Sequence, residues 1–129
     1  FCSLHSYGTT PKIKVYCNPV LAKSTPDPTV IQAPDRMFYL YATEDIHNIP
    51  IYKSPDLVNW TFVGTAFTDA TRPTFEPKAG LWAPDINHID GKYVLYYAMS
   101  RWGVDLRYRM RRCRLAGRTI YGPGKTLQE

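Results

Sequence analysis

The sequence lacks long apolar runs, long helix-forming stretches and paired cysteines. No stretch of its 129 residues approaches the about 20 apolar residues of a membrane-spanning helix, so that class is excluded and no membrane partner is expected. Its three cysteines, Cys2, Cys17 and Cys113, form no CxxC pair, so no metal site is predicted. Cys2 and Cys17 can close one disulfide in an oxidising compartment. With 11 prolines and 10 tyrosines, the composition favours strands and turns.

The body of the protein has no excess of charge of either sign. Residues 1–103 carry nine basic and nine acidic side chains, and the whole net charge of +5 lies in residues 104–129. An Arg-rich arm for nucleic acid or an anionic surface is one interpretation of this tail. Only Tyr108 and Tyr121 supply aromatic rings among its basic residues, so no nucleic-acid partner is predicted.

What the sequence does contain is a set of short strands. The length and the 44% of apolar residues suit one folded domain. Residues 29–31 and 37–41 are predicted to form a strand pair joined by the turn Ala33-Pro34-Asp35-Arg36. Two further strands are expected at 49–52 and 61–63. No helix longer than a turn or two is indicated before residue 103.

The same pattern then begins again. Residues 85–89 and 92–97 are predicted strands, and Asp90-Gly91 between them is a strong signal for a type I′ hairpin turn. Asp27 and Asp85 precede or open the first strand of each unit, 58 residues apart. A four-stranded repeat of about this period is typical of a β-propeller blade. We therefore predict an all-β fold with one blade and the start of a second.

Asp27 and Asp85 are the candidate catalytic carboxylates. The innermost strands of a propeller line its channel, so both groups are expected at the mouth of one cavity. Two facing carboxylates are what glycoside hydrolysis requires, one to activate water and one to protonate the leaving oxygen. Asp before a strand is also ordinary turn chemistry, and that structural interpretation stays open.

Several longer motifs resemble glycoside hydrolase family 43, in the right order over about residues 18–103. The motifs are Ser24-Thr25-Pro26-Asp27-Pro28-Thr29-Val30-Ile31, Ile49-Pro50-Ile51-Tyr52-Lys53-Ser54-Pro55-Asp56-Leu57-Val58-Asn59-Trp60, Gly80-Leu81-Trp82-Ala83-Pro84-Asp85-Ile86 and Gly91-Lys92-Tyr93-Val94-Leu95-Tyr96-Tyr97. The stretch Phe67-Thr68-Asp69-Ala70-Thr71-Arg72-Pro73-Thr74-Phe75 is most similar to the arabinanase-like members.

The resemblance implies a five-bladed propeller, of which about the first two blades are present. It implies a monomeric, secreted or periplasmic hydrolase that cleaves arabinan- or xylan-type polysaccharide with inversion. Asp27 matches the general base, and Trp82 and Asp85 match a pair that contacts the sugar. The family's pKa-tuning Asp and its general acid, a Glu, belong to later blades, and neither Glu44 nor Glu76 matches the acid. No cofactor is predicted; some members hold calcium on the channel axis, so calcium is possible in the full-length parent.

The chain alone is therefore expected to be an inactive N-terminal fragment. The alternative is a non-catalytic carbohydrate-binding or interaction fragment that uses Trp82 without bond cleavage. For the aromatic and imidazole side chains outside these motif positions we expect structural or solvated roles. They are Tyr39, Tyr41, Tyr93, Tyr96, Tyr97 and Trp60 in the core or on sheet faces, and His5, His47 and His88 without metal-ligand spacing.

The predicted organisation has three parts: an N-terminal loop over 1–26, the first blade and the inner half of the second over 27–103, and the basic tail over 104–129. The resemblance stops after Gly103. Shifted forward by one base, residues 118–129 can encode Gly-Pro-Phe-Thr-Asp-Arg-Gly-Lys-Leu-Phe-Lys, which resembles the family at that point. Our hypothesis is that the tail is an out-of-frame translation.

Overall fold

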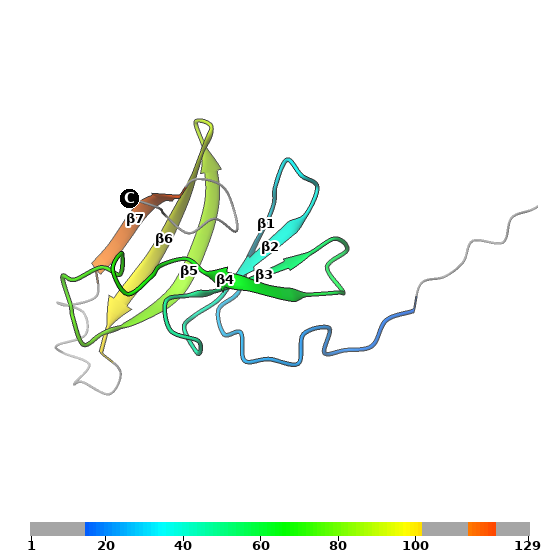
Figure 1. The fold of residues 1–129 in the computed structure, drawn as a ribbon, viewed down its shortest axis with the longest axis horizontal. Coiled ribbons are helices and arrows are strands. Elements are labelled where there is room, and N and C mark those ends of the chain that lie inside the picture. The colour runs from blue at the N-terminus through cyan, green and yellow to red at the C-terminus, as the bar shows by residue number, and fades with distance from the viewer. Residues whose placement is uncertain (1–14, 102–113, 121–129) are drawn as a thin grey trace, which may run out of the picture.

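The protein is seen in a computed structural model that describes residues 15–101 and the backbone of residues 114–120 (Figure 1). All regular structure in these ranges is β-strand. The strands are β1 (Thr29–Gln32), β2 (Phe38–Tyr41), β3 (Pro50–Ser54), β4 (Thr61–Thr65), β5 (Gly80–Ile89), β6 (Lys92–Ser100) and β7 (Arg114–Ile120). In the part described, no helix is long and apolar enough to span a membrane. The all-β prediction is confirmed.

The first sheet is an antiparallel meander with the order β1-β2-β3-β4. The predicted turn between β1 and β2 is confirmed: the Arg36 amide donates to the Ala33 carbonyl at 2.9 Å. Asp35 closes it by accepting the Met37 amide at 3.0 Å, as a short acidic side chain in a turn does. All four strands expected over residues 29–63 are present, with ends that differ by one or two residues.

The second sheet has the order β5-β6-β7 (Figure 1). The predicted hairpin is confirmed, because both Asp90 (φ 49°) and Gly91 (φ 75°) have the positive φ of a type I′ turn. Strand β5 begins five residues before the predicted start at residue 85. It accommodates Pro84 because the register with β6 is irregular between Trp82 and Asp85, where a proline need not donate to the ladder.

Strand β7 lies inside the tail that we hypothesise to be out of frame. It pairs with β6 from Tyr93↔Ile120 to Met99↔Arg114. Strand pairing uses backbone groups that every non-proline residue carries, so this pairing is compatible with either reading frame. The hypothesis stays a prediction, and the rest of residues 104–129 lies outside the described residues.

The main core lies between the two sheets. Strand β1 contacts β5, so the first strands of the two sheets lie side by side. Alternate residues of the first sheet face this core, and they meet the apolar residues of β5 and β6 as strand periodicity requires. The largest buried side chains of the cluster are Tyr41, Ile49, Phe67, Leu81, Leu95 and Met99.

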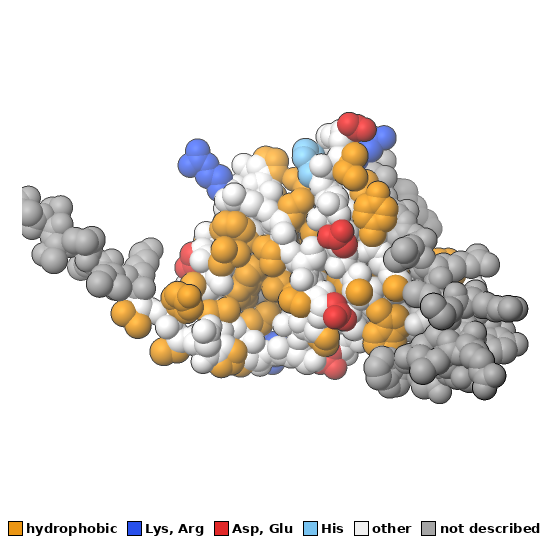
Figure 2. Space-filling view, turned by 180° about the vertical axis from the view of Figure 1, so that it is seen from behind, with side chains coloured by type: hydrophobic (Ala, Val, Ile, Leu, Met, Phe, Trp, Pro, Cys, Tyr) orange, Lys and Arg blue, Asp and Glu red, His pale blue; other side chains and the backbone are white. Residues whose placement is uncertain are grey.

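The other face of the first sheet is also apolar; we call it the outer face. Val30, Leu40, Tyr52 and Phe62 are successive cross-strand partners on it. Leu40 and Tyr52 are buried, whereas Val30 and Phe62 remain 44% and 47% exposed. Figure 2 shows apolar side chains gathered in a broad patch beside the N-terminal segment. The outer face therefore resembles an inner layer more than a solvated surface.

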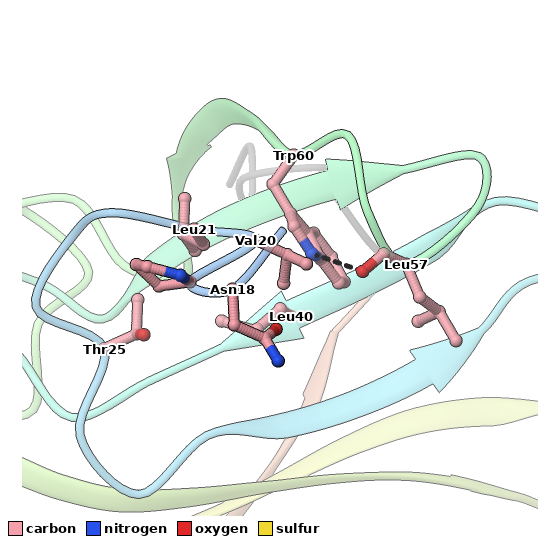
Figure 3. Close-up of a pocket in the computed structure, with 8 residues that line it drawn as sticks. Asn18, Val20, Leu21, Thr25, Leu40, Leu57 and Trp60 are labelled. Carbon is pink, nitrogen blue, oxygen red and sulfur yellow. Dashed lines mark hydrogen bonds between the residues drawn. The ribbon is translucent and has the colours of Figure 1, made fainter. Parts of the chain in front are cut away.

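A groove of about 470 Å³ opens beside this face (Figure 3). Residues of the N-terminal segment form one side, and Leu40, Leu57 and Trp60 form the other. Trp60 packs against the small cluster around Leu40, so the structural role expected for it is confirmed. Its indole N–H donates to the Leu57 carbonyl at 3.0 Å.

The turn before Trp60 is organised by Asp56. Oδ1 of Asp56 accepts the amides of Val58 and Asn59 at 3.0 and 2.8 Å, and Oδ2 accepts the Asn59 side chain at 2.7 Å. The backbone N–H groups of Asn59 and Val58 favour the ionised carboxylate and lower its pKa to about 2. The motif Ser54-Pro55-Asp56-Leu57-Val58-Asn59-Trp60 is thus a self-capped turn that fixes Trp60.

Candidate functional site

Asp27 lies just before β1, in a segment without regular structure between Pro26 and Pro28. The residue is exposed and has a φ of 47°, a left-handed conformation that Asp tolerates better than most residues. Its Oδ2 accepts the Thr43 hydroxyl at 2.8 Å. The Thr43 amide also donates to the Pro26 carbonyl at 2.9 Å. One buried threonine therefore holds both the backbone and the carboxylate of this segment.

Trp82 and Ala83 form the irregular part of β5. The half-buried Trp82 indole donates from Nε1 to the Ser100 carbonyl at 2.9 Å. Its ring lies so close to Gly80 that an added Cβ would overlap the ring atoms Cζ2 and Cε2. Ala83 has a φ of 45°, and its amide donates to the Thr43 hydroxyl oxygen at 2.7 Å. Glycine at position 80 leaves room for the indole, which explains one residue of the Gly80-Leu81-Trp82 motif.

Asp85 follows the irregularity and is exposed. Its Oδ1 lies 3.5 Å from the Thr29 hydroxyl, and its Oδ2 accepts the Asn87 side-chain amide at 3.0 Å. The Thr29 oxygen also accepts the Ile86 amide, at 3.4 Å. Thr29 thus connects β1 to β5, whereas Thr43 connects the segment before β1 to β5 through shorter contacts.

The three predicted site residues, Asp27, Trp82 and Asp85, lie where β1 and the segment before it meet β5. We call this junction the seam. Thr43 connects Asp27 to the backbone next to Trp82, and Thr29 connects β1 to Asp85. Acidic side chains reach the surface between the apolar patch and the residues drawn in grey (Figure 2). The sequence predicted the carboxylates and the indole; it did not indicate the two threonines that join them, because each bridge spans more than 10 residues of sequence.

A second acidic group at the seam, Glu44, forms an ion pair with Arg72. The two terminal guanidinium nitrogens donate to its carboxylate, Nη2 to Oε1 at 2.7 Å and Nη1 to Oε2 at 2.8 Å. The amides of Leu81 and Asn48 donate to its two oxygens at 2.8 and 2.9 Å. Arg72 also donates to the Asn48 side chain and to the Ala79 carbonyl. The two side chains are 9% and 13% exposed, so this pair ties the first sheet to the start of β5.

The environment of Glu44 stabilises its ionised form. Burial acts to raise its pKa, but the hydrogen bonds from Arg72, Asn48 and Leu81 and the charge of Arg72 together outweigh burial. The net result is a pKa below the ordinary value. This network was not predicted, because Arg72 and Leu81 lie 28 and 37 residues from Glu44 and no local pattern connects them.

The histidines do not form a metal site in the part of the chain that the structure describes. No group of three His, Cys, Asp or Glu side chains is arranged to hold an ion there. His47 is exposed, with Nδ1 3.8 Å from Glu44 and Nε2 3.6 Å from Asp69. His88 stacks on Tyr93 with ring centroids 4.7 Å apart. His5 lies outside the described residues.

The remaining side-chain expectations concern the tyrosines and cysteines. Four of the five tyrosines assigned to the core are buried, and Tyr96 is a sheet-face residue that is 40% exposed. Cys17 is a free, exposed cysteine. Cys2 lies outside the described residues, so a disulfide between Cys2 and Cys17 stays a prediction.

The protein therefore has an all-β fold of two antiparallel sheets whose first strands are in contact. The candidate site, with its exposed carboxylates and its indole, lies at that junction. Residues 16–111 match the family described as Glycosyl hydrolases family 43. This match covers most of the sequence and continues eight residues past the expected end of the resemblance. The chain belongs to glycosyl hydrolases family 43.

Individual relatives agree with the family match. The chain is 34% identical over 83 residues to the arabinan endo-1,5-alpha-L-arabinosidase A of Aspergillus niger, covering 62% of the chain and 25% of the relative. It is 37% identical over 83 residues to the extracellular exo-alpha-(1->5)-L-arabinofuranosidase ArbA of Cellvibrio japonicus, covering 60% and 22%. The chain thus spans about a quarter of the length of these relatives.

A solved structure gives the same result. The Cellvibrio cellulosa alpha-L-arabinanase complexed with arabinohexaose matches with a TM-score of 0.54 and 37% identity. The match covers 63% of this chain and 26% of that one.

Proposed function

We propose that this chain is the N-terminal part of a secreted, inverting glycoside hydrolase that cleaves arabinan-type polysaccharide. The observation that carries the proposal is the exposed, hydrogen-bonded Asp27 at the seam of a family 43 chain whose relatives are named for action on arabinan or arabinofuranosides. The name of one relative contains the word extracellular, which supports secretion. The substrate partner is an arabinan polysaccharide or oligosaccharide, and the complete protein is a monomer.

Asp27 is the general base in this proposal. Its carboxylate takes a proton from a water molecule as the water oxygen bonds to the anomeric carbon. The glycosidic C–O bond breaks at the same time, and the leaving oxygen takes a proton from a carboxylic acid within hydrogen-bond reach. In inverting enzymes the carboxyl group of this acid lies about 6.5–9.5 Å from that of the base. Asp85 accepts hydrogen bonds from sugar hydroxyls, and Trp82 offers the ring that packs against the sugar.

The described residues offer no glutamate that could serve as the acid. Among the described residues the two glutamates are both in ion pairs: Glu44 with Arg72, and Glu76 with Arg101 at 3.3 Å. Neither is free to act as a proton donor opposite Asp27. We propose that the general acid belongs to a later part of the complete enzyme and that the 129-residue chain has no hydrolytic activity.

The fold proposed for the complete enzyme is a five-bladed propeller, of which the first sheet is one blade. The apolar outer face supports this, because a sheet with apolar side chains on both faces is stable as a layer between two others. The second sheet covers one face, and a later blade of the complete enzyme would cover the face that carries Val30 and Phe62.

The test combines the gene with an assay. The source DNA is sequenced from about codon 95 to several hundred bases past codon 129, and the purified chain and the complete product are assayed on linear arabinan. We expect one base to restore a frame that encodes a later Asp and Glu, activity only in the complete product, and loss of that activity in Asp27→Asn. A shifted frame interrupted by stop codons would exclude the out-of-frame tail.

The second candidate is a carbohydrate-binding fragment, favoured by the pairing of both described glutamates. It predicts that this chain binds arabinan oligosaccharides without cleaving them. Binding would then be lost in Trp82→Ala and unchanged in Asp27→Asn, as measured by isothermal titration calorimetry.

A further inference from the structure

Thr43 occupies a position in which one hydroxyl serves two segments of the site. It is 5% exposed and follows β2 by two residues. The oxygen accepts the Ala83 amide at 2.7 Å, and the hydroxyl proton is donated to Asp27 Oδ2 at 2.8 Å. A threonine hydroxyl has one proton, so its donor is fully committed to the carboxylate.

The geometry divides the Asp27 carboxylate into two different oxygens. Oδ2 is held by Thr43, and no other hydrogen bond to the carboxylate is present within the described residues. Because the Ala83 amide fixes the threonine oxygen, the hydroxyl proton points to Asp27 and not elsewhere. Oδ1 is therefore the oxygen left to take a proton.

We propose that Thr43 is a positioning residue for Asp27, which sets the direction of the general base and couples it to the Trp82–Asp85 segment. This inference rests on the proposed function, in which Asp27 is the base. Misplacing a reacting group by about 1 Å can cost about 100-fold in rate. The Ala83 amide is the other partner of Thr43, so the same hydroxyl also restrains the backbone next to Trp82, where Ala83 has a φ of 45°.

Two substitutions separate the hydroxyl from the packing of the side chain. Thr43→Val keeps the shape and removes the hydroxyl, whereas Thr43→Ser keeps the hydroxyl and removes a methyl group. If the hydroxyl positions Asp27, Thr43→Val in the complete enzyme lowers kcat by about 10- to 100-fold with little change in KM, and Thr43→Ser retains most of the activity. If Thr43 only fills space, the order of the two variants is reversed.

Asp27→Asn in the same enzyme distinguishes this inference from the proposed function. If Asp27→Asn abolishes activity while Thr43→Val keeps kcat, the positioning role is wrong and the base assignment stands. If Asp27→Asn remains fully active, the base assignment itself is wrong, and the positioning role fails with it.

A second measurement uses the 129-residue chain and no substrate. Removing the Asp27 charge with Asp27→Asn is expected to shift the NMR signal of the Ala83 amide proton, because the two groups share the Thr43 hydroxyl. The Ile86 amide, which donates to Thr29, is the internal control and stays in place. Thr43→Ser preserves the Ala83 shift; an Ala83 signal indifferent to Asp27→Asn would overturn the coupling.

Discussion

The seam between the two sheets holds two kinds of carboxylate. Glu44 is nearly buried and accepts four hydrogen bonds, two from Arg72 and one each from Asn48 and Leu81. Asp27 is exposed and accepts one, from Thr43. The first carboxylate helps to hold the two sheets together. The second has one oxygen, Oδ1, that accepts no hydrogen bond among the described residues, as the proposed general base requires. The two acids therefore differ in how many of their oxygen lone pairs already accept hydrogen bonds.

The largest effect on stability is expected when Glu44 loses its partner. Arg72→Met leaves a buried carboxylate without its cation and is expected to reduce the free energy of unfolding by about 3–5 kcal/mol. Urea denaturation followed by circular dichroism measures the loss. Lys78→Met removes the same charge at an exposed site and should change stability by less than about 0.5 kcal/mol. Equal effects of the two variants would contradict the structural role of the pair.

The next largest effect is expected at Gly80. Gly80→Ala places a Cβ against the Trp82 ring, and overpacking of this kind costs about 1–3 kcal/mol. Tryptophan fluorescence and urea denaturation report the displaced indole. In a double-mutant cycle with Trp82→Leu, the alanine should cost much less, because the ring that it meets is gone. A cost independent of Trp82 would mean that the backbone, and not the indole, requires glycine.

A smaller effect, which depends on pH, is expected at Glu44 itself. The pKa of Glu44 is lowered in the folded protein, so its stabilisation is complete above its ordinary value of 4.5. That stabilisation is lost as the pH falls through the lower folded value. Stability measured against pH should therefore fall less steeply at acid pH in Glu44→Gln than in the wild type. Asp45→Asn, at an exposed neighbour, should keep the wild-type slope.

The smallest effect on stability is expected at the open carboxylate. Asp27→Asn can keep the Thr43 contact and exposes no new surface, so the free energy of unfolding should change by less than about 0.5 kcal/mol. Thermal unfolding of the two proteins, compared at equal concentration, measures this. A loss of several kcal/mol would place Asp27 with Glu44 among the structural carboxylates.

The sequence predicted what is local and missed what crosses the seam. The turn at Asp35 and the hairpin at Asp90-Gly91 were predictable, because their chemistry lies within a few residues. The Arg72–Glu44 pair spans 28 residues and the Thr43–Ala83 bond spans 40, and no short pattern encodes either. The early start of β5 was not predicted. A strand that contains Pro84 needs the irregular register between Trp82 and Asp85, and no short sequence pattern indicates that irregularity.

The meander of the first sheet also sets an order of events during synthesis. Each strand pairs with the one that precedes it, so β1 to β4 can assemble once residue 65 has left the ribosome. At that moment neither Arg72 nor Leu81 is available to donate to Glu44. The ion pair can form once Arg72 follows, whereas the Leu81 amide arrives only with β5. The last hydrogen bond to Glu44 therefore marks the docking of the two sheets, and until then the apolar face of the first sheet that faces the core is uncovered.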